Sequence, residues 1–412
     1  MKVQVSYRDL LVGTLSDDKA DGNIYFEYSA AFLSTQIELS PFHLPLRAGV
    51  FHHTNPAFHR LFGLFYDSLP DRWGEQVLQA RLAKEGISIE NLSTLEKLCY
   101  VGTRGIGALA YRPDRDSLQA EESERLDLLA ITRSATDIIE GHSEGVLDEL
   151  ASSGGTAGGA RPKILIGVRT SDPNYLIARA YAVPVGYEPW LLKIETAPER
   201  QYGRVEYAYS LMAGSAGIEM PPTRLITHST PKGEVGHFAV KRFDLFEGNR
   251  IHVHSLAGLL HHDFNSPTLD YTKYLRACEV LTKSREFLPE IFRRIAFNYR
   301  AGVRDDHPKN HAFLMDSGGH WRPSPAYDIV LSRGRAAFPQ PAHEMPLGGK
   351  NRALSRDWLF AAGSNIGLPR NQINTILDDV EHSVGRWPEF SREAGIAQER
   401  SIEVSRQFEP WG

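Results

Sequence analysis

The order of the hydrophobic patterns along the chain of 412 residues limits most strongly how it can fold. The N-terminal residues alternate apolar and polar side chains, as at Val3, Val5 and Tyr7, and a period of two is typical of strands. Further apolar runs predict strands of one sheet at 164–168, 174–181 and 189–195. From about residue 254 the spacing becomes helical, which predicts helices at 270–282, 286–303, 355–365 and 369–384. A β-rich part, a mixed part and a helical part in this order predict an α+β fold.

A polar and charged segment at 113–126 marks a boundary between parts of the chain. At about 150 residues per domain, the length allows two or three such parts. Helical patterns at 56–66 and 70–86 lie in the first part, and another at 203–217 lies in the second. We interpret His252 and His254, which alternate on one strand, as polar surface residues rather than ligands.

Composition and charge exclude several classes of protein. Hydrophobic residues make up 42% and charged residues 24%, which is typical of a globular chain. The 46 basic and 51 acidic residues give a net charge of -5, so no basic excess indicates nucleic-acid binding. Cys99 and Cys278 lie far apart, which excludes a disulfide framework and suits a reducing cytoplasm. We expect neither a signal peptide nor a membrane span, because no sufficiently long apolar stretch is present.

The segment 304–314, RDDHPKNHAFL, carries the residues that phosphoryl transfer to a hydroxyl requires. One aspartate, Asp305, would accept the hydroxyl proton, and Asn310, five positions later, would hold Mg²⁺. Asp328, in the next hairpin, would be the second oxygen ligand. By itself this spacing is also compatible with a polar turn. His307 and His311 form an H-x3-H pair, but no third ligand is evident, which argues against zinc.

The Gly-rich segment 152–163, SSGGTAGGARPK, could bring backbone N–H groups close to phosphates. It is not a P-loop, because Ala160 and Arg161 follow Gly159, and a flexible linker is the alternative. Lys193 lies in the apolar run PWLLKIE, where a buried ammonium needs an anionic partner. Phosphate oxygens would serve, Glu206 on the following helix is a candidate ion-pair partner, and a strand-edge lysine reaching water is the alternative.

Together these segments resemble the HipA family of bacterial serine/threonine kinases, the toxins of HipA–HipB toxin–antitoxin pairs. The motifs that carry the resemblance occur in the family's order: SLPDRWGEQVL at 68–78, VGTRGIGALAYRP at 101–113, GGARPK at 158–163, LLKIE at 191–195, AVKRFD at 239–244, DDHPKN at 305–310 and YDI at 327–329. Val303 and Arg304 stand where the family usually has Asn-Thr.

The resemblance implies a protein-kinase-like, two-lobed α+β fold. Its expected parts are a β-rich N-terminal subdomain, a nucleotide-binding lobe with a Gly-rich phosphate loop, and an all-α catalytic lobe, at 1–115, 125–245 and 246–412. It makes Asp305 the catalytic base, and Asn310 and Asp328 the Mg²⁺ ligands. The residues it implies for ATP binding are Gly158, Gly159, Ala160, Arg161, Pro162, Lys163, Lys193, Lys241, Arg242, Phe243, His307, Lys309, Asn310, Tyr327 and Asp328. Candidate autophosphorylation sites in the loop are Thr156, Ser153 and Ser152.

The function that the resemblance implies is growth arrest by a cytoplasmic, ATP- and Mg²⁺-dependent protein kinase. Its protein substrate would be a translation component such as an aminoacyl-tRNA synthetase. A helix-turn-helix antitoxin of HipB type would neutralise it, and DNA would be contacted only through that antitoxin. Two alternatives stay open, a non-catalytic pseudokinase acting as corepressor and a small-molecule kinase of related fold.

Overall fold

The computed structural model describes residues 1–18, 22–115, 125–142, 150, 161–178, 183–332, 334 and 340–411. An antiparallel sheet in the order β4-β3-β2-β1-β5 opens the chain. Its strands are β1 Lys2–Tyr7, β2 Leu10–Asp17, β3 Ile24–Tyr28, β4 Val50–His52 and β5 Leu109–Arg112. The helices of this part are α1 Ala30–Leu33, η1 Pro56–Phe58, α2 Gly63–Tyr66, α3 Arg72–Lys84, η2 Ile89–Asn91 and α4 Thr94–Val101. The helix expected at 56–66 is thus two short turns, whereas that at 70–86 forms as α3.

A second antiparallel sheet, in the order β7-β6-β8-β10-β9, forms the middle of the molecule. Its strands are β6 Lys163–Arg169, β7 Leu176–Ala178, β8 Tyr187–Lys193, β9 Thr223–Thr230 and β10 Gly233–Lys241. The helices α5 Leu128–Ile139, η3 Pro198–Arg200 and α7 Tyr202–Ser215 accompany it, and a hairpin of β11 Leu245–Phe246 and β12 Asn249–Arg250 follows. Lys163 and Lys193 are direct cross-strand partners at the end of the β6–β8 ladder.

The remaining part is predominantly helical. Its helices are α8 Leu256–Leu259, α9 Tyr271–Thr282, α10 Leu288–Ala301, η4 Pro308–Asn310, α11 Arg356–Asn365, α12 Arg370–Gly385, α13 Trp387–Glu393 and α14 Gln398–Ser405. The expectation of an all-α lobe needs one correction, because β13 His252–Ser255, β14 Ala312–Met315 and β15 Trp321–Pro323 pair into a small antiparallel sheet. The central strand of this sheet, β14, begins directly after the predicted catalytic loop.

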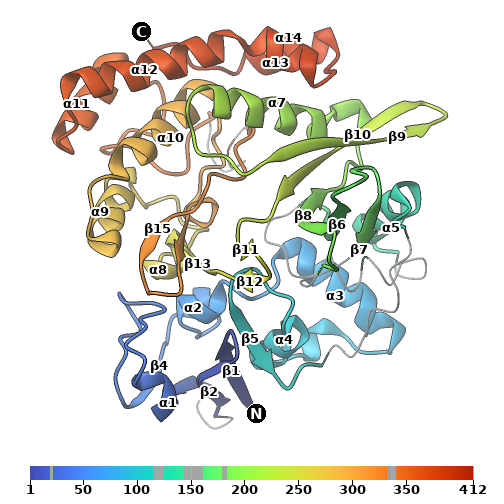
Figure 1. Ribbon diagram of the computed structural model, residues 1–412, viewed down its shortest axis with the longest axis vertical. Helices are drawn as coiled ribbons and strands as arrows, with labels where there is room; N and C mark the ends of the chain where they lie inside the picture. Colours follow the sequence, from blue (N-terminus) through green and yellow to red (C-terminus); the bar gives the residue numbers. More distant parts are fainter. Residues whose placement is uncertain are drawn as a thin grey trace.

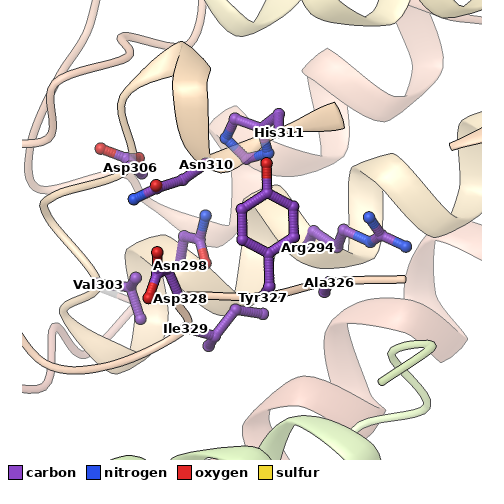
Figure 2. A pocket seen from close by; sticks show the side chains of 10 residues that line it. All are labelled: Arg294, Asn298, Val303, Asp306, Asn310, His311, Ala326, Tyr327, Asp328 and Ile329. Carbon is purple, nitrogen blue, oxygen red and sulfur yellow. The ribbon is translucent and has the colours of Figure 1, made fainter. Parts of the chain in front are cut away.

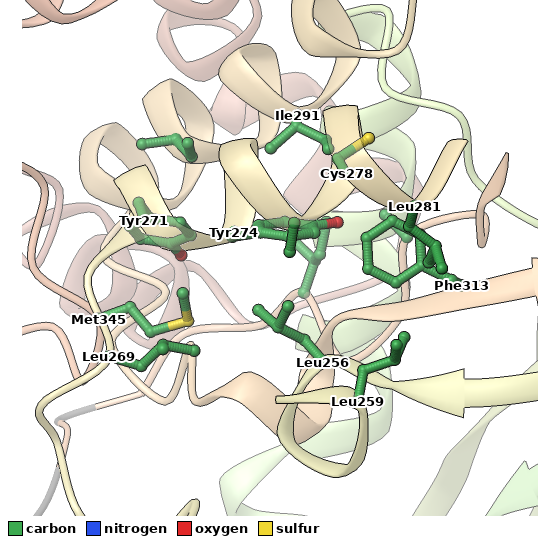
Figure 3. Packing of buried hydrophobic residues seen from close by; sticks show 14 of the residues in the cluster. Leu256, Leu259, Leu269, Tyr271, Tyr274, Cys278, Leu281, Ile291, Phe313 and Met345 are labelled. Carbon is green, nitrogen blue, oxygen red and sulfur yellow. The ribbon is translucent and has the colours of Figure 1, made fainter. Parts of the chain in front are cut away.

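Buried side chains join the first and last parts of the chain into one core. In Figure 3, Tyr274 and Cys278 of α9 pack against Leu256 of α8, Ile291 of α10 and Phe313 of β14. Burying one such large apolar side chain stabilises the fold by about 1.5–3 kcal/mol. The core holds α9, α10 and the small sheet in fixed positions relative to the loop at 304–310.

The N-terminal part contacts both other parts of the molecule. Trp73 and Val77 of α3 pack with Ile164 and Leu192 of the middle sheet in a second buried cluster, and Figure 1 shows α3 beside β6 and β8. Toward the helical part, Asp67 accepts a 2.7 Å hydrogen bond from the backbone N–H of Ser255 and another from the Ser255 hydroxyl at 2.6 Å.

The expectation that His252 and His254 lie at the surface is wrong. His252 is 1% exposed and His254 is fully buried. The Nδ1 atom of His254 lies 2.7 Å from the Asp67 carboxylate and its Nε2 atom 3.0 Å from the Ser40 hydroxyl, while His252 Nε2 lies 3.0 Å from the Leu39 carbonyl oxygen. Through these contacts the two buried rings connect the N-terminal part of the chain to β13. In the described part of the chain, no helix combines the length and hydropathy that crossing a membrane requires.

Candidate active site

The side chain of Lys193, the last residue of β8, lies at the centre of the candidate site. Its Nζ atom donates a 2.5 Å hydrogen bond to Glu206 on α7 and another to the carboxylate of Asp328. The predicted ion pair between Lys193 and Glu206 is present. Because Glu206 is buried, this ion pair is shielded from water. The lysine thus joins the middle sheet, the helix beside it and the segment after β15.

The charges of this cluster keep its members ionised. Burial alone would lower the pKa of Lys193, but the carboxylates of Asp328 and Glu206 raise it above its ordinary value. Burial would likewise raise the pKa of Asp328, but the ammonium groups of Lys193 and Lys163 lower it to about 2. Near neutral pH, Asp328 is therefore a carboxylate that can bind a cation, and Lys193 is an ammonium that can bind an anion.

Asn310 and Asp328 line the same pocket, together with Asn298 and Tyr327, as Figure 2 shows. The amide Nδ2 atom of Asn310 donates a 2.8 Å hydrogen bond to the backbone oxygen of Asp305. This bond commits the nitrogen to the loop and leaves the amide oxygen as the atom suited to a metal. Because Mg²⁺ prefers carboxylate and amide oxygens, both residues fit the predicted magnesium site.

The two adjacent aspartates of the loop have different surroundings. Asp305 is exposed, and no hydrogen bond to its carboxylate is found among the described residues. Asp306 is 2% exposed, and its carboxylate accepts hydrogen bonds from the Tyr271 hydroxyl at 2.7 Å and the Glu344 backbone N–H at 2.8 Å, with His343 Nδ1 at 2.9 Å. Asp305 is therefore open to solvent, whereas Asp306 anchors the loop in the core.

Replacing Asp306 by alanine should destabilise the protein strongly. The change removes a buried, charged hydrogen-bond acceptor and leaves the groups that donate to it without that partner. We expect this to lower the free energy of unfolding by about 3 kcal/mol. Urea unfolding followed by circular dichroism would measure this loss. Asp305→Ala is the matched neighbouring control and should change the unfolding free energy by less than about 0.5 kcal/mol. Equal stabilities of the two variants would contradict the assignment of Asp306 as the anchor.

Arg304, which replaces a residue usual in the resembled family, also braces this loop. Its guanidinium is buried and hydrogen-bonded to the Glu409 carboxylate at 2.8 Å, to the Gln407 carbonyl oxygen at 2.9 Å and to the Ser332 carbonyl oxygen at 3.3 Å. The C-terminal segment therefore holds the start of the loop.

Other residues expected at the nucleotide lie around this pocket. The hydroxyl of Tyr327 donates a 2.7 Å hydrogen bond to the backbone oxygen of Lys309, and the Tyr327 ring lies 5.8 Å from that of Phe243. The ammonium of Lys309 lies over the ring of Tyr66, 4.6 Å from its centroid. The ring of His307 packs against Phe264, 5.5 Å away.

Within the described residues, neither of the two histidines considered for zinc has two further His, Cys, Asp or Glu side chains grouped around it. His311 is buried against Tyr271 and Tyr274, and burial lowers its pKa to about 4. Throughout the described ranges, no group of three or more His, Cys, Asp or Glu side chains is arranged to hold a metal ion.

The segment expected to line the adenine site is held by ion pairs. Lys241, at the end of β10, donates a 2.8 Å hydrogen bond to Glu188 of β8. The guanidinium of Arg242 is paired with Asp244 through two hydrogen bonds of 2.9 and 2.7 Å, and Asp244 also accepts the Gly107 backbone N–H at 2.8 Å. Arg242 therefore has a structural role in fixing the turn between the sheets.

The Gly-rich loop lies mostly outside the described residues. Gly158, Gly159 and Ala160 fall there, as do Thr156, Ser153 and Ser152. At its C-terminal end, Arg161 and Pro162 line a second pocket together with Lys193 and Glu206, and the guanidinium of Arg161 lies 4.2 Å from the centroid of the Tyr202 ring. The described end of the loop thus leads directly to the lysine cluster.

Two protein-family models match this sequence. A model of the HipA-like C-terminal domain matches residues 155–387, more than half of the chain, and a model of the HipA N-terminal domain matches residues 3–112. The chain belongs to the HipA family. The C-terminal match contains Lys163, Lys193 and the loop at 304–310, and the N-terminal match contains α3.

A solved HipA structure agrees with this chain in fold. HipA of Shewanella oneidensis MR-1, determined in complex with HipB and its operator DNA, has 17% identical residues and a TM-score of 0.71, covering 98% of this chain and 95% of that one. The chain therefore has the α+β fold of HipA proteins. A Helicobacter pylori proinflammatory kinase, CtkA, has 12% identity and a TM-score of 0.31 over 53% of this chain and 92% of its own. No curated protein is significantly similar to this sequence.

Sequence reasoning missed residues that the HipA N-terminal domain brings to the site. Asp71, the N-cap of α3, has its Oδ2 atom 3.8 Å from the Nζ atom of Lys163. The carboxylates of Asp67 and Asp71 also act on the half-buried side chain of Lys309, whose pKa burial lowers. The motif at 68–78 predicted a helix start, but nothing in its residues indicated where the carboxylate points.

Proposed function

We propose that this chain is a HipA-type serine/threonine protein kinase that uses Mg²⁺ and ATP. The observation that carries the proposal is the convergence of Lys193, Glu206 and Asp328, with Asn310 on the wall of the pocket that Asp328 lines. An ammonium for phosphate oxygens and two oxygen ligands for a metal are what phosphoryl transfer requires. The family membership supports the same chemistry.

Each residue would have a defined part in the reaction. Lys193 would bind phosphate oxygens, with Glu206 keeping its ammonium charged and in place. Asp305 would accept the proton of the substrate hydroxyl as the oxygen bonds to the γ-phosphorus and the bond to ADP breaks. Asn310 and Asp328 would hold Mg²⁺, which when bound neutralises charge on the phosphates.

We propose further that the hydroxyls of the Gly-rich loop, on Ser152, Ser153 and Thr156, are sites of autophosphorylation. The loop ends at Arg161–Lys163, next to Lys193, so a hydroxyl within it could reach the γ-phosphate. Peptide mapping would identify which of the hydroxyls accepts the phosphate.

The partner we propose is a helix-turn-helix antitoxin of HipB type, because HipA of Shewanella oneidensis was determined with HipB and operator DNA. The net charge of -5 favours DNA contact through that antitoxin rather than by this chain alone. Two free, buried cysteines, Cys99 and Cys278, agree with the cytoplasm as its compartment. The protein substrate would be a translation component such as an aminoacyl-tRNA synthetase, and its modification would arrest growth.

Phosphopeptide analysis of a bacterial lysate treated with the purified protein and Mg-ATP tests this function. We expect new phosphoserine or phosphothreonine on few lysate proteins, absent when EDTA replaces Mg²⁺. ATP binding without any new phosphopeptide would favour the pseudokinase. Phosphate found only on small molecules would favour a small-molecule kinase of related fold.

A further inference from the structure

Two lysines lie opposite each other on neighbouring strands of the candidate site. Lys163 on β6 and Lys193 on β8 are cross-strand partners, and the side chain of Lys163 is only 2% exposed. Like charges directly opposite each other destabilise a sheet, and a buried ammonium needs a counter-charge. The carboxylates of Glu206 and Asp328 pair with Lys193. The buried ammonium of Lys163 therefore needs an anion of its own.

The N-terminal domain supplies that anion. The Oδ2 atom of Asp71 lies 3.8 Å from the Nζ atom of Lys163. Its other oxygen, Oδ1, accepts a 2.8 Å hydrogen bond from the backbone N–H of Gly74 and so caps α3. The Oδ2 atom is buried and accepts no hydrogen bond among the described residues, so it acts on Lys163 by charge alone.

The same turn of helix also holds the backbone of Lys163. The indole Nε1 atom of Trp73 donates a 2.9 Å hydrogen bond to the Lys163 carbonyl oxygen, and the Trp73 side chain is fully buried. Asp71 and Trp73 thus fix both the ammonium and the main chain of one lysine. That lysine is the residue at which the Gly-rich loop enters the sheet.

We propose that Asp71 is a positioning residue for the nucleotide site, through which the N-terminal domain holds Lys163 in place to bind the phosphates of ATP. This inference rests on the proposed kinase function. A helix cap needs only the Oδ1 atom, so capping alone does not account for an Oδ2 atom buried against a lysine. Without the carboxylate, the Lys163 ammonium would turn to the next anion, Asp328, and compete there with Mg²⁺ and Lys193.

Asp71→Asn tests this role, because asparagine caps a helix as well as aspartate does and only the charge is lost. Isothermal titration calorimetry would compare Mg-ATP with adenosine, which has no phosphates. We expect the variant to bind Mg-ATP at least about tenfold more weakly and adenosine with unchanged affinity. Asp71→Ser, a second neutral cap, should behave in the same way and serves if the first variant folds poorly.

Asp127→Asn is the matched control, since Asp127 caps α5 at an exposed position through bonds of 2.9 and 3.1 Å to Leu129 and Ala130. It should bind both ligands like the wild type. Mg-ATP affinity in Asp71→Asn equal to that of the wild type, or an equal loss for adenosine, would overturn the positioning role. Failure of the wild type itself to bind Mg-ATP would instead overturn the proposed function on which the inference rests.

A double-mutant cycle separates action through Lys163 from a general effect on the fold. Lys163→Met removes the ammonium and keeps the length of the side chain. In that background, Asp71→Asn should cause no further loss of Mg-ATP affinity, because the group that it positions is already absent. Losses that add in full would mean that Asp71 acts elsewhere, and the inference would be wrong.

Discussion

Asp305→Ala is expected to abolish phosphoryl transfer while leaving Mg-ATP binding and stability close to those of the wild type. Asp305 is exposed, and the hydrogen bond from Asn310 goes to its backbone oxygen, which alanine retains. Loss of a general base costs about 10²- to 10⁴-fold in rate. Incorporation of labelled γ-phosphate into protein measures the rate, and calorimetry and thermal unfolding measure the properties that should persist.

Asp357→Ala provides the control for this prediction, because Asp357 is likewise an exposed aspartate, in the first turn of α11. It should transfer phosphate at the wild-type rate. If Asp305→Ala retained full transfer, another group would have to be the base.

Asp328→Asn should cause the largest loss of Mg-ATP affinity of any single change in the site. The side chain binds Lys193 and is one of the two proposed metal ligands, so its charge serves the phosphate site and the metal site together. Asparagine suits the position because Asp328 has a backbone φ of 54°, a left-handed conformation that asparagine tolerates better than alanine does. We expect about a 100-fold loss, or about 2.8 kcal/mol.

Titration calorimetry of Mg-ATP into Asp328→Asn, Asp305→Ala and the wild type checks this prediction. The first variant should bind far more weakly than the second. Similar affinities of the two variants would remove Asp328 from the metal site.

Short sequence motifs predict those parts of the candidate site whose residues lie close together in the chain. The spacing of Asp305 and Asn310, and an apolar strand interrupted by Lys193, are local patterns with a chemical meaning. The ion pair between Lys193 and Glu206 was also predictable, because a buried ammonium on a strand needs an anion and the next helix offered one.

Contacts between distant segments could not be predicted in this way. Asp305 and Asp306 are adjacent and identical in type, yet only the fold brings Tyr271 and Glu344 to the second of them. His254 pairs with Asp67, and Lys163 forms an ion pair with Asp71, both from the N-terminal domain. The pairing of β13 with β14 and β15 into one small sheet was not predicted, because the strands are short and helices separate β13 from the other two.

The central claim is that the cluster around Lys193 binds Mg-ATP for transfer of its γ-phosphate to a protein hydroxyl. The most direct test is transfer of labelled γ-phosphate by the purified wild-type protein, alone and with bacterial lysate, in Mg²⁺ and in EDTA. We predict protein-bound label in Mg²⁺, on phosphoserine or phosphothreonine, and none in EDTA or with Asp305→Ala. Absence of label from both the chain and the lysate proteins, under conditions in which the wild type binds ATP, would contradict the claim.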